Sequence, residues 1–255
     1  MTEPRQLPWL QAGQPFPPTS EAWGPSDPIP GLLAAGGTLD VHSLLRAYAH
    51  GIFPWYSDDQ PILWWSPDPR MVLQTAHFQL HTNLRKALRQ GLRTGELEFR
   101  IDHDFPAVIG ACAGMRRPGQ RGTWIVPDMV EAYIRLHRAG HAHSVETWFR
   151  GELVGGLYCV AIGRMVFGES MFSRRDNASK MALAALVACC RAWGVPAIDC
   201  QQNTGHLASL GAREMPRSDF LAWVQQGIVQ PPPTWKFNPL YWNGFLFNST
   251  SPHTP

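Results

Sequence analysis

The sequence predicts an α/β (α+β) protein in two parts, a small N-terminal domain over residues 1–70 and a larger domain over residues 71–245. Two observations support this prediction. Prolines and large aromatic residues crowd residues 51–70, which excludes a long helix there. From residue 71 onward, strand-like and helix-like patterns alternate. The last residues, 246–255, are expected to form a disordered tail.

The N-terminal part contains one clear helix signal. Residues 1–30 are rich in Pro, Ser and Gly and are expected to be irregular chain. Residues 38–51 then offer Thr38 or Asp40 as an N-cap and an apolar face that includes Tyr48. We therefore expect a short helix that leads into the aromatic segment.

The larger part predicts a mixed sheet with helices on both faces. The expected strands cover residues 71–80, 97–101, 143–150, 153–162, 165–170 and 197–201. The expected helices cover residues 82–93, 105–114, 127–140, 178–193, 204–211 and 217–226. Residues 143–150 and 153–162 are separated by a short turn and should form a hairpin. This order is compatible with the acyltransferase fold built on a splayed central sheet, as one of several options.

Composition narrows the function classes. Hydrophobic residues make up 44% and charged residues 16% of the 255 residues, which is typical of a globular protein. The formal net charge is only +2, so a nucleic acid would have to be held by a local basic patch. The five cysteines form no C-x-x-C motif and indicate a reduced, cytoplasmic protein. The N-terminus has no basic region followed by an apolar one, and no apolar run of about 18 residues occurs, so neither an export signal nor a membrane span is expected.

One expected helix carries a basic face. Arg85, Arg89 and Arg93 recur every four residues, with Lys86 beside them. Cations on one helix face bind phosphates because each neutralised phosphate releases counterions. The alternative is an ordinary solvated face.

A histidine-rich segment suggests a metal site, but only weakly. His137, His141 and His143 precede Glu146. Zinc sites normally show a second pair of ligands at a recognised spacing, and no such pair is found here. We therefore expect capping or hydrogen bonding at these histidines, and no metal.

Two glycines interrupt an expected strand. Gly155 and Gly156 are costly in a strand unless a bulge or a close backbone approach requires them. A bulge could turn amide groups toward an acyl carbonyl, and a simple bend is the alternative.

The segment 168–179 places Glu169 at the end of a strand and Arg174 and Arg175 before a helix N-terminus. Acyltransferases that use coenzyme A keep a glycine-rich pyrophosphate loop at such a place, since helix N-termini bind anions. The glycine pattern is missing here. The sequence therefore favours a different acyl carrier.

The short strand 197–201 contains a second polar pair. Alternation points Asp199 and Gln201 to one face and Cys200 to the other. A carboxylate and an amide at the end of a buried strand can orient a nucleophile and its proton, or can simply complete the strand's hydrogen bonding. Cys200 as a nucleophile is the weaker interpretation, because a nearby histidine is not assured.

Several blocks together resemble the leucyl/phenylalanyl-tRNA protein transferase family. They are GLLAAGGTLDVHSLLRAYAHGIFPWY, PILWWSPDPR, GTWI, EAYIRLHRAGHAHSVETW, LVGGLYCVA, GESMFSRRDNASK, IDCQ and HLASLGA, in order from about residue 31 to about residue 220. The resemblance implies a GNAT-like acyltransferase domain with a splayed sheet. It implies transfer of Leu or Phe, with Met as a further option, from aminoacyl-tRNA to proteins that begin with Arg or Lys. The product would be an N-end-rule degradation signal, made by a monomer without cofactors.

The resemblance also implies site residues. In the family, two tryptophans hold the terminal adenosine of the tRNA, and Trp55 and Trp124 occupy those positions here. Glu169, Asp199 and Gln201 occupy the catalytic positions. The amino-acid side-chain pocket would be formed by Leu157, Leu186 and Cys190, where relatives place Met and Phe residues, so the preference between Leu and Phe stays open.

The aromatic segment fits this interpretation. Tryptophans held by prolines form a rigid surface for a base, worth about 1 to 3 kcal/mol per stacked base. We expect Trp55 to contact RNA and at least one of Trp64 and Trp65 to be structural. Two other classes stay open: an N-acyltransferase that uses coenzyme A, and a tRNA-binding protein without catalytic activity.

Overall fold

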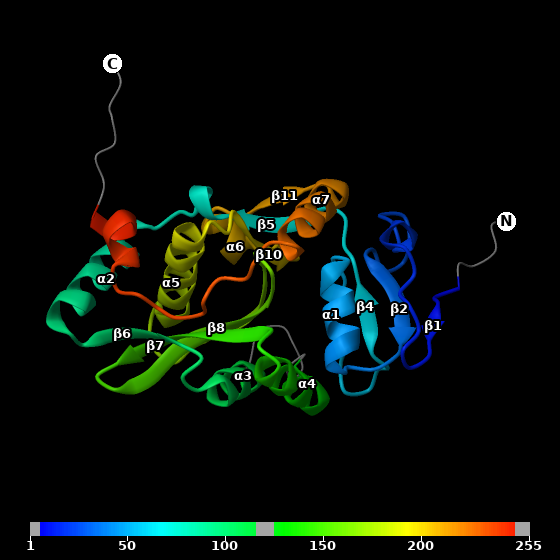
Figure 1. The fold of residues 1–255 in the computed structure, drawn as a ribbon, viewed down its shortest axis with the longest axis horizontal. Coiled ribbons are helices and arrows are strands. Elements are labelled where there is room, and N and C mark those ends of the chain that lie inside the picture. The colour runs from blue at the N-terminus through cyan, green and yellow to red at the C-terminus, as the bar shows by residue number, and fades with distance from the viewer. Residues whose placement is uncertain (1–5, 116–124, 248–255) are drawn as a thin grey trace, which may run out of the picture.

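The computed structural model describes residues 6–115 and 125–247, and contains two β-sheets (Figure 1). One sheet has four strands in the order β1-β2-β4-β3, and the other has seven in the order β11-β5-β10-β9-β8-β7-β6. The predicted fold class is confirmed: a small N-terminal unit precedes a mixed sheet flanked by helices. The chain passes from one sheet to the other between Trp65 and Arg70.

The small sheet consists of short strands that the sequence analysis did not predict. They are β1 (Trp9–Leu10), β2 (Leu32–Gly36), β3 (Phe53–Pro54) and β4 (Leu63–Trp65). The expectation of irregular chain up to residue 30 is thus wrong at β1, which pairs in parallel with β2. The proline of β3 is tolerated because β3 lies at the edge of the sheet.

Helix α1 (Val41–Ala49) connects β2 to β3 and leads into the aromatic segment, as predicted. The Asp40 side chain caps it by accepting a hydrogen bond from the Ser43 backbone N–H. In Figure 1, α1 lies between the small sheet and the rest of the molecule. It contacts α4, α7 and β8, so it carries Tyr48 into the interior of the larger part.

The large sheet is built mostly from antiparallel pairs. Its strands are β5 (Arg70–Gln74), β6 (Leu97–Ile101), β7 (Ala142–Phe149), β8 (Glu152–Ile162), β9 (Met165–Ser173), β10 (Ala197–Gln201) and β11 (Arg213–Met215). β7 and β8 form the predicted hairpin, whereas β11 was not predicted. β9 and β10 pair in parallel, which makes the sheet mixed.

Helices cover both faces of this sheet. They are α2 (Thr82–Thr94), α3 (Phe105–Ala113), α4 (Pro127–Arg138), α5 (Ala178–Trp193), α6 (Gly205–Ser209) and α7 (Arg217–Ile228). α3, α4 and α1 belong to one hydrophobic cluster, and α2 and α5 belong to a second one. Among the described residues, no helix combines the length and apolarity that crossing a membrane requires.

Gly155 is explained by close packing between β8 and α5. A Cβ atom at Gly155 would lie 2.5 Å from the Cβ atom of Ala178. The Thr147 hydroxyl fixes the same place by donating to the Ala178 carbonyl at 2.9 Å. The close approach that the sequence suggested therefore sets the first turn of α5 against the sheet.

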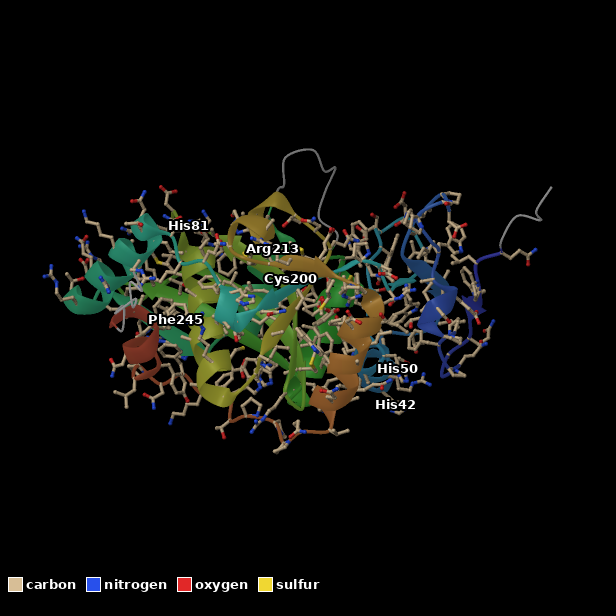
Figure 2. The ribbon with its side chains drawn as sticks, turned by 90° about the horizontal axis from the view of Figure 1, so that it is seen from above. His42, His50, His81, Cys200, Arg213 and Phe245 are labelled. Carbon is tan, nitrogen blue, oxygen red and sulfur yellow. The ribbon has the colours of Figure 1, made fainter. Side chains whose placement is uncertain are left out.

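The C-terminal segment is ordered beyond the predicted start of the tail. A π-helical turn spans Asn243–Phe247, in which Phe245 and Leu246 are buried. Arg89 of α2 donates to the Leu246 carbonyl. Figure 2 shows Phe245 at the α2 end of the molecule, far from His42 and His50 of the α1 region. The tail predicted over residues 246–255 therefore does not begin at residue 246.

Candidate active site

Two neighbouring strands each carry a bulge where the predicted site residues lie. On β9, Gly168 pairs with Cys159 and Ser170 with Tyr158, so Glu169 is the extra residue. On β10, Cys200 is the extra residue between the paired positions Asp199 and Gln201. Bulges re-aim side chains and are frequent next to active sites.

β9 and β10 also part at this place. Their recorded parallel pairing covers Val166 with Ile198 and Phe167 with Asp199. Continued in the same register, Glu169 would lie opposite Gln201. Instead of backbone pairing, the Gln201 side-chain Nε2 donates to Glu169 Oε1 at 2.9 Å. The two bulges thus create the splay of the predicted mixed sheet at these two side chains.

Glu169 is the centre of a hydrogen-bond network that reaches into α1 and α4. The Tyr48 hydroxyl donates to Glu169 Oε1 at 2.7 Å. The Tyr133 hydroxyl donates to Glu169 Oε2 at 3.2 Å, and the two tyrosine hydroxyls lie 2.5 Å apart. The carboxyl group is therefore surrounded by three donors on three different elements.

The environment raises the pKa of Glu169 to about 8. Burial is the largest cause, because it disfavours the charged carboxylate. The nearby Asp199 charge acts in the same direction, whereas the Tyr48 and Tyr133 hydroxyls and the Arg70 charge partly oppose it. A carboxyl group with this pKa can take up or release a proton near neutral pH.

Asp199 is engaged by a buried arginine that the sequence analysis did not identify. Arg70 Nε donates to Asp199 Oδ1 at 2.8 Å and Arg70 Nη2 to Asp199 Oδ2 at 2.7 Å. Both side chains are completely buried. Asp199 Oδ1 also accepts the backbone N–H of Gln201 at 2.9 Å. Asp199 therefore holds the backbone of Gln201, while the Gln201 side-chain amide donates to Glu169.

Gln201 adopts a strained backbone and Cys200 faces away. The φ angle of Gln201 is 62°, in the left-handed region that residues other than glycine rarely occupy. Cys200 packs against the second hydrophobic cluster, on the other side of the sheet from Asp199 and Arg70. Burial raises the pKa of the Cys200 thiol far above its usual value, which disfavours the reactive thiolate.

Three residues of the network were missed by sequence reasoning. Tyr48 was assigned only to an apolar face, and Tyr133 and Arg70 were not singled out. A signal was available for the tyrosines, since a buried tyrosine hydroxyl usually finds a polar partner. For Arg70 the signal is its position before the apolar run Met71–Leu73, because a buried arginine requires a paired anion.

The tryptophans of the aromatic segment divide into buried and accessible ones. Trp64 is fully buried and donates from Nε1 to the Gly36 carbonyl, and Trp65 is 7% exposed. The structural role expected for at least one of them is confirmed. Trp55 is partly exposed, and its ring packs on Trp65 with centroids 5.3 Å apart. Trp124, the second predicted adenosine-binding residue, lies outside the described residues.

The predicted side-chain pocket is closed in this structure. Leu157, Leu186 and Cys190 are 3%, 1% and 0% exposed, and all three belong to the second hydrophobic cluster. They lie on the α5 side of the sheet, whereas the tyrosines that bind Glu169 belong to the first cluster. The structure therefore does not bring these residues into the Glu169 network.

The basic face of α2 is only partly accessible. Lys86 and Arg93 are exposed and Arg85 is half-buried. Arg89 instead holds the C-terminal segment through its bond to the Leu246 carbonyl. Three of the four predicted cations, Arg85, Lys86 and Arg93, are thus at least partly accessible on the surface of α2.

The histidine-rich segment is hydrogen-bonded. His143 Nδ1 lies 2.7 Å from Asp102 Oδ2, and His137 Nδ1 lies 2.8 Å from the Ala142 carbonyl. The buried Glu146 carboxylate accepts bonds from Ser144, from Trp148 and from a backbone amide. The hydrogen-bonding interpretation is thus confirmed for His137 and His143.

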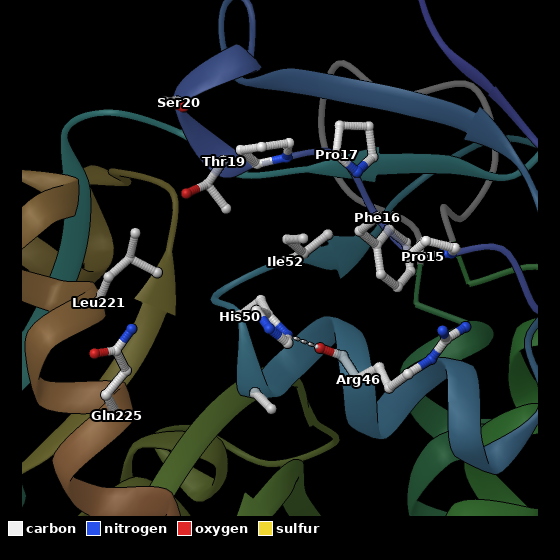
Figure 3. A pocket seen from close by; sticks show the side chains of 12 residues that line it. Pro15, Phe16, Pro17, Thr19, Ser20, Arg46, His50, Ile52, Leu221 and Gln225 are labelled. Atoms are coloured by element: carbon white, nitrogen blue, oxygen red, sulfur yellow. Dashed lines mark hydrogen bonds between the residues drawn. The ribbon is translucent and has the colours of Figure 1, made fainter.

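A separate cavity of about 390 Å³ lies between the N-terminal segment, α1 and α7 (Figure 3). Its walls include Phe16, Arg46, His50 and Leu221. His50 is tied to the Arg46 carbonyl through Nδ1 at 2.7 Å. The lining does not include Glu169 or its partners, so this cavity is distinct from the network at the sheet splay.

Comparison with known proteins identifies the chain. The family model described as "Leucyl/phenylalanyl-tRNA protein transferase" matches residues 72–225, and that of the family's N-terminal domain matches residues 37–68. Together with the splayed sheet and its buried acid–base network, these matches define an aminoacyltransferase. The chain belongs to the leucyl/phenylalanyl-tRNA protein transferase family.

Curated relatives agree over nearly the whole length. A leucyl/phenylalanyl-tRNA–protein transferase of Polaromonas sp. (strain JS666 / ATCC BAA-500) is 61% identical over 95% of both chains. One of Albidiferax ferrireducens (strain ATCC BAA-621 / DSM 15236 / T118) is 60% identical over 96% of both. Among solved structures, L-PGS from Bacillus licheniformis aligns with 68% of this chain and 54% of its own, at 10% identity and a TM-score of 0.36. A TM-score this low carries no argument about this chain.

Proposed function

We propose that the protein transfers Leu or Phe from aminoacyl-tRNA to the α-amino group of proteins that begin with Arg or Lys. The single observation that carries the proposal is the 61% identity, over 95% of both chains, to a protein named for this tRNA-to-protein transfer. The product would be an N-end-rule degradation signal. We further propose a cytoplasmic monomer whose N-terminal domain ends near residue 70.

The chemistry of the transfer needs a base for the attacking amine. An α-amino group has a pKa of about 7.7 to 8.0, close to the value of about 8 for Glu169. A proton can therefore pass between the two groups at little cost. We propose Glu169 as the general base, with Tyr48 and Tyr133 holding its carboxyl group. Asp199 is a poorer candidate, because Arg70 occupies both of its oxygens.

The proposed transfer is an ester aminolysis. The amine nitrogen forms a bond to the ester carbonyl carbon, and the bond from that carbon to the terminal ribose oxygen breaks. Glu169 accepts the proton that the amine loses and returns it to the departing ribose oxygen. Gln201 contributes by keeping the Glu169 carboxyl group in place at the splay. Holding amine and ester together can supply roughly 7 to 11 kcal/mol.

We propose Trp55 as a stacking surface for the terminal adenosine, supported by its partial exposure and its backing by Trp65. Trp55→Ala should weaken binding of the tRNA 3′ end by about 1 to 3 kcal/mol, since base stacking on an aromatic ring has that magnitude. Trp9→Ala is the matched control, because Trp9 is 60% exposed at the edge of the small sheet. Equal affinities of the two variants, measured by fluorescence titration, would remove Trp55 from the RNA-binding surface. Trp124 stays proposed on the resemblance alone.

We propose that Arg85, Lys86 and Arg93 of α2 contact tRNA phosphates, with Arg89 mainly holding the C-terminal segment. Arg85→Ala combined with Arg93→Ala should flatten the plot of log affinity against log salt concentration by about 0.7 to 0.9 per lost contact. The control is Arg135→Ala with Arg138→Ala on α4. A double variant of α2 with the wild-type slope would return this helix to an ordinary solvated surface.

The pocket for the Leu or Phe side chain is proposed at Leu157, Leu186 and Cys190. These side chains supply the apolar surface that such a group needs. They are buried within one hydrophobic cluster, so an entering side chain would have to displace part of its packing. The ratio of Leu to Phe transfer then depends on how far this cluster opens.

The test of the proposed acceptor rule uses two versions of one model protein. One begins with Arg and the other with Met, and each is incubated with tRNA charged with labelled Leu or Phe. Label in the Arg-started protein alone would support the proposal. Equal label in both would show transfer without the acceptor rule.

A further inference from the structure

Arg70 connects parts of the molecule that are far apart in sequence. It lies at the start of β5 and is completely buried. Besides its two bonds to Asp199, its Nη1 donates to the Gly51 carbonyl at 3.1 Å. A single guanidinium group therefore ties the end of α1 to the end of β10.

The guanidinium group of Arg70 lies over two aromatic rings. Its Cζ atom lies 4.8 Å from the ring centre of Phe53 and 4.6 Å from that of Phe220. These rings come from β3 of the small sheet and from α7. Because a guanidinium stacks on aromatic faces, its hydrogen-bonding edge is left to point at Asp199 and Gly51.

The first connection from Arg70 leads to Glu169 through Asp199. Asp199 Oδ1 accepts the backbone N–H of Gln201, which stabilises the unusual φ of 62° at that residue. With this backbone, Gln201 Nε2 reaches Glu169 Oε1 at 2.9 Å. Movement of the Asp199 carboxylate would therefore move a donor of Glu169.

The second connection leads to the same oxygen through α1. The Gly51 N–H donates to the Tyr48 carbonyl at 3.0 Å, while its own carbonyl accepts from Arg70. The Tyr48 hydroxyl then donates to Glu169 Oε1 at 2.7 Å. Gly51 has a φ of 70°, and a Cβ atom there would lie 2.5 Å from the Leu221 side chain, so the turn is tightly enclosed.

We propose that Arg70 is a positioning residue of the transfer reaction, which aligns the Gln201 and Tyr48 donors on Glu169 Oε1 without contacting substrate. This inference rests on the proposed role of Glu169 as the base. Only arginine can fill the position, because its planar fork binds two carboxylate oxygens and a carbonyl at once. Lysine keeps the charge but presents a single ammonium group.

The expected change in the ionisation of Glu169 follows from the charged and titratable groups that face its carboxyl group. These are Tyr48 on α1, Tyr133 on α4, Asp199 on β10 and Arg70 on β5. Hydrogen bonds donated to a carboxylate favour its ionised form. When the Oε1 donors lose their alignment, Glu169 should hold its proton to higher pH. Arg70→Lys should therefore raise the pH at which Glu169 ionises.

The experiment is a titration of Glu169 by NMR of protein labelled with ¹³C in the glutamate carboxyl groups. Glu169→Gln identifies the signal. We expect Arg70→Lys to move the midpoint upward by about one pH unit, the equivalent of one weakened hydrogen bond to a charged group. At pH 7 turnover should fall about tenfold, with tRNA affinity unchanged. An unchanged midpoint in a folded Arg70→Lys protein would overturn the proposal.

Two further variants keep the test decisive. Phe220→Leu removes one of the two rings that pack on Arg70. It should raise the midpoint of the Glu169 titration by less than Arg70→Lys does, and it replaces that variant in the test if Arg70→Lys does not fold. Arg100→Lys changes an exposed arginine that pairs with Glu98 and stacks on Trp148, and should leave the midpoint unchanged. The NMR titration of Glu169 can be measured whether or not the protein transfers an amino acid. Failure of the wild-type protein to transfer would overturn the proposed function, while the midpoints still decide the role of Arg70.

Discussion

Glu169→Gln should lower turnover by about 10²- to 10⁴-fold, the usual contribution of a general base. Glutamine keeps the shape of the side chain, its oxygen can still accept the hydrogen bond from Tyr48, and its NH2 group can donate to the Tyr133 hydroxyl, but it cannot take the proton of the amine. The variant should therefore fold and bind tRNA as the wild type does.

The pH dependence of the Glu169→Gln variant tests the role of Glu169 as a base more specifically than the loss of turnover does. The base acts in its ionised form, and its pKa is raised to about 8, so activity grows as pH rises toward that value. The acceptor amine must also lose its proton, with a pKa of about 7.7 to 8.0. Below pH 7, log kcat/KM for the acceptor should rise with a slope of about two per pH unit in the wild type and about one in Glu169→Gln.

One outcome would reassign Glu169. If Glu169→Gln raised the KM for the acceptor and left kcat and the slope unchanged, Glu169 would only attract the cationic terminus of the acceptor.

Asp199→Ala should destabilise the protein by about 3 to 5 kcal/mol, because it leaves the buried Arg70 charge without a partner. It also frees the backbone of Gln201, so turnover should be lost at temperatures where the protein is still folded. Urea unfolding and single-turnover transfer measure the two effects. Near-normal turnover in a folded Asp199→Ala protein would show that the positioning of Gln201 is not needed.

A surface ion pair provides the control for Asp199. Glu98 pairs with Arg100 at 2.8 Å, but the Glu98 side chain is 58% exposed. Glu98→Ala should change the free energy of unfolding by less than about 1 kcal/mol, since exposed ion pairs contribute little. Equal losses of unfolding free energy in Glu98→Ala and Asp199→Ala would mean that burial does not determine how much the Arg70–Asp199 pair stabilises the protein.

Sequence patterns predicted most of the large sheet and its helices because these elements are long enough to show a period. Strand 153–162 and helix 178–193 are examples, and the alternation in residues 197–201 correctly separated Cys200 from Asp199. The small sheet could not be found in this way. Its strands span two to five residues, rich in Pro and Trp, which is too short for any period to appear.

The network around Glu169 was predicted only in part, for a different physical reason. Arg70 and Asp199 are 129 residues apart, and Tyr48 and Glu169 are 121 apart. Pairs at such separations are set by how the sheets and helices pack, which local patterns do not encode. The bulges at Glu169 and Cys200 likewise depend on the neighbouring strand, so the splay of β9 and β10 had to be seen in the structure.

If the splay of the large sheet transfers an amino acid from tRNA, a charged tRNA and not coenzyme A must be the acyl donor. The most direct measurement offers an Arg-started model protein two labelled acyl donors in parallel, Phe-tRNA and acetyl-coenzyme A. We expect label from Phe-tRNA alone, and loss of that label in Glu169→Gln with tRNA still bound. Label from acetyl-coenzyme A, or no label from Phe-tRNA while the folded wild type binds it, would show that this site does not transfer amino acids from tRNA.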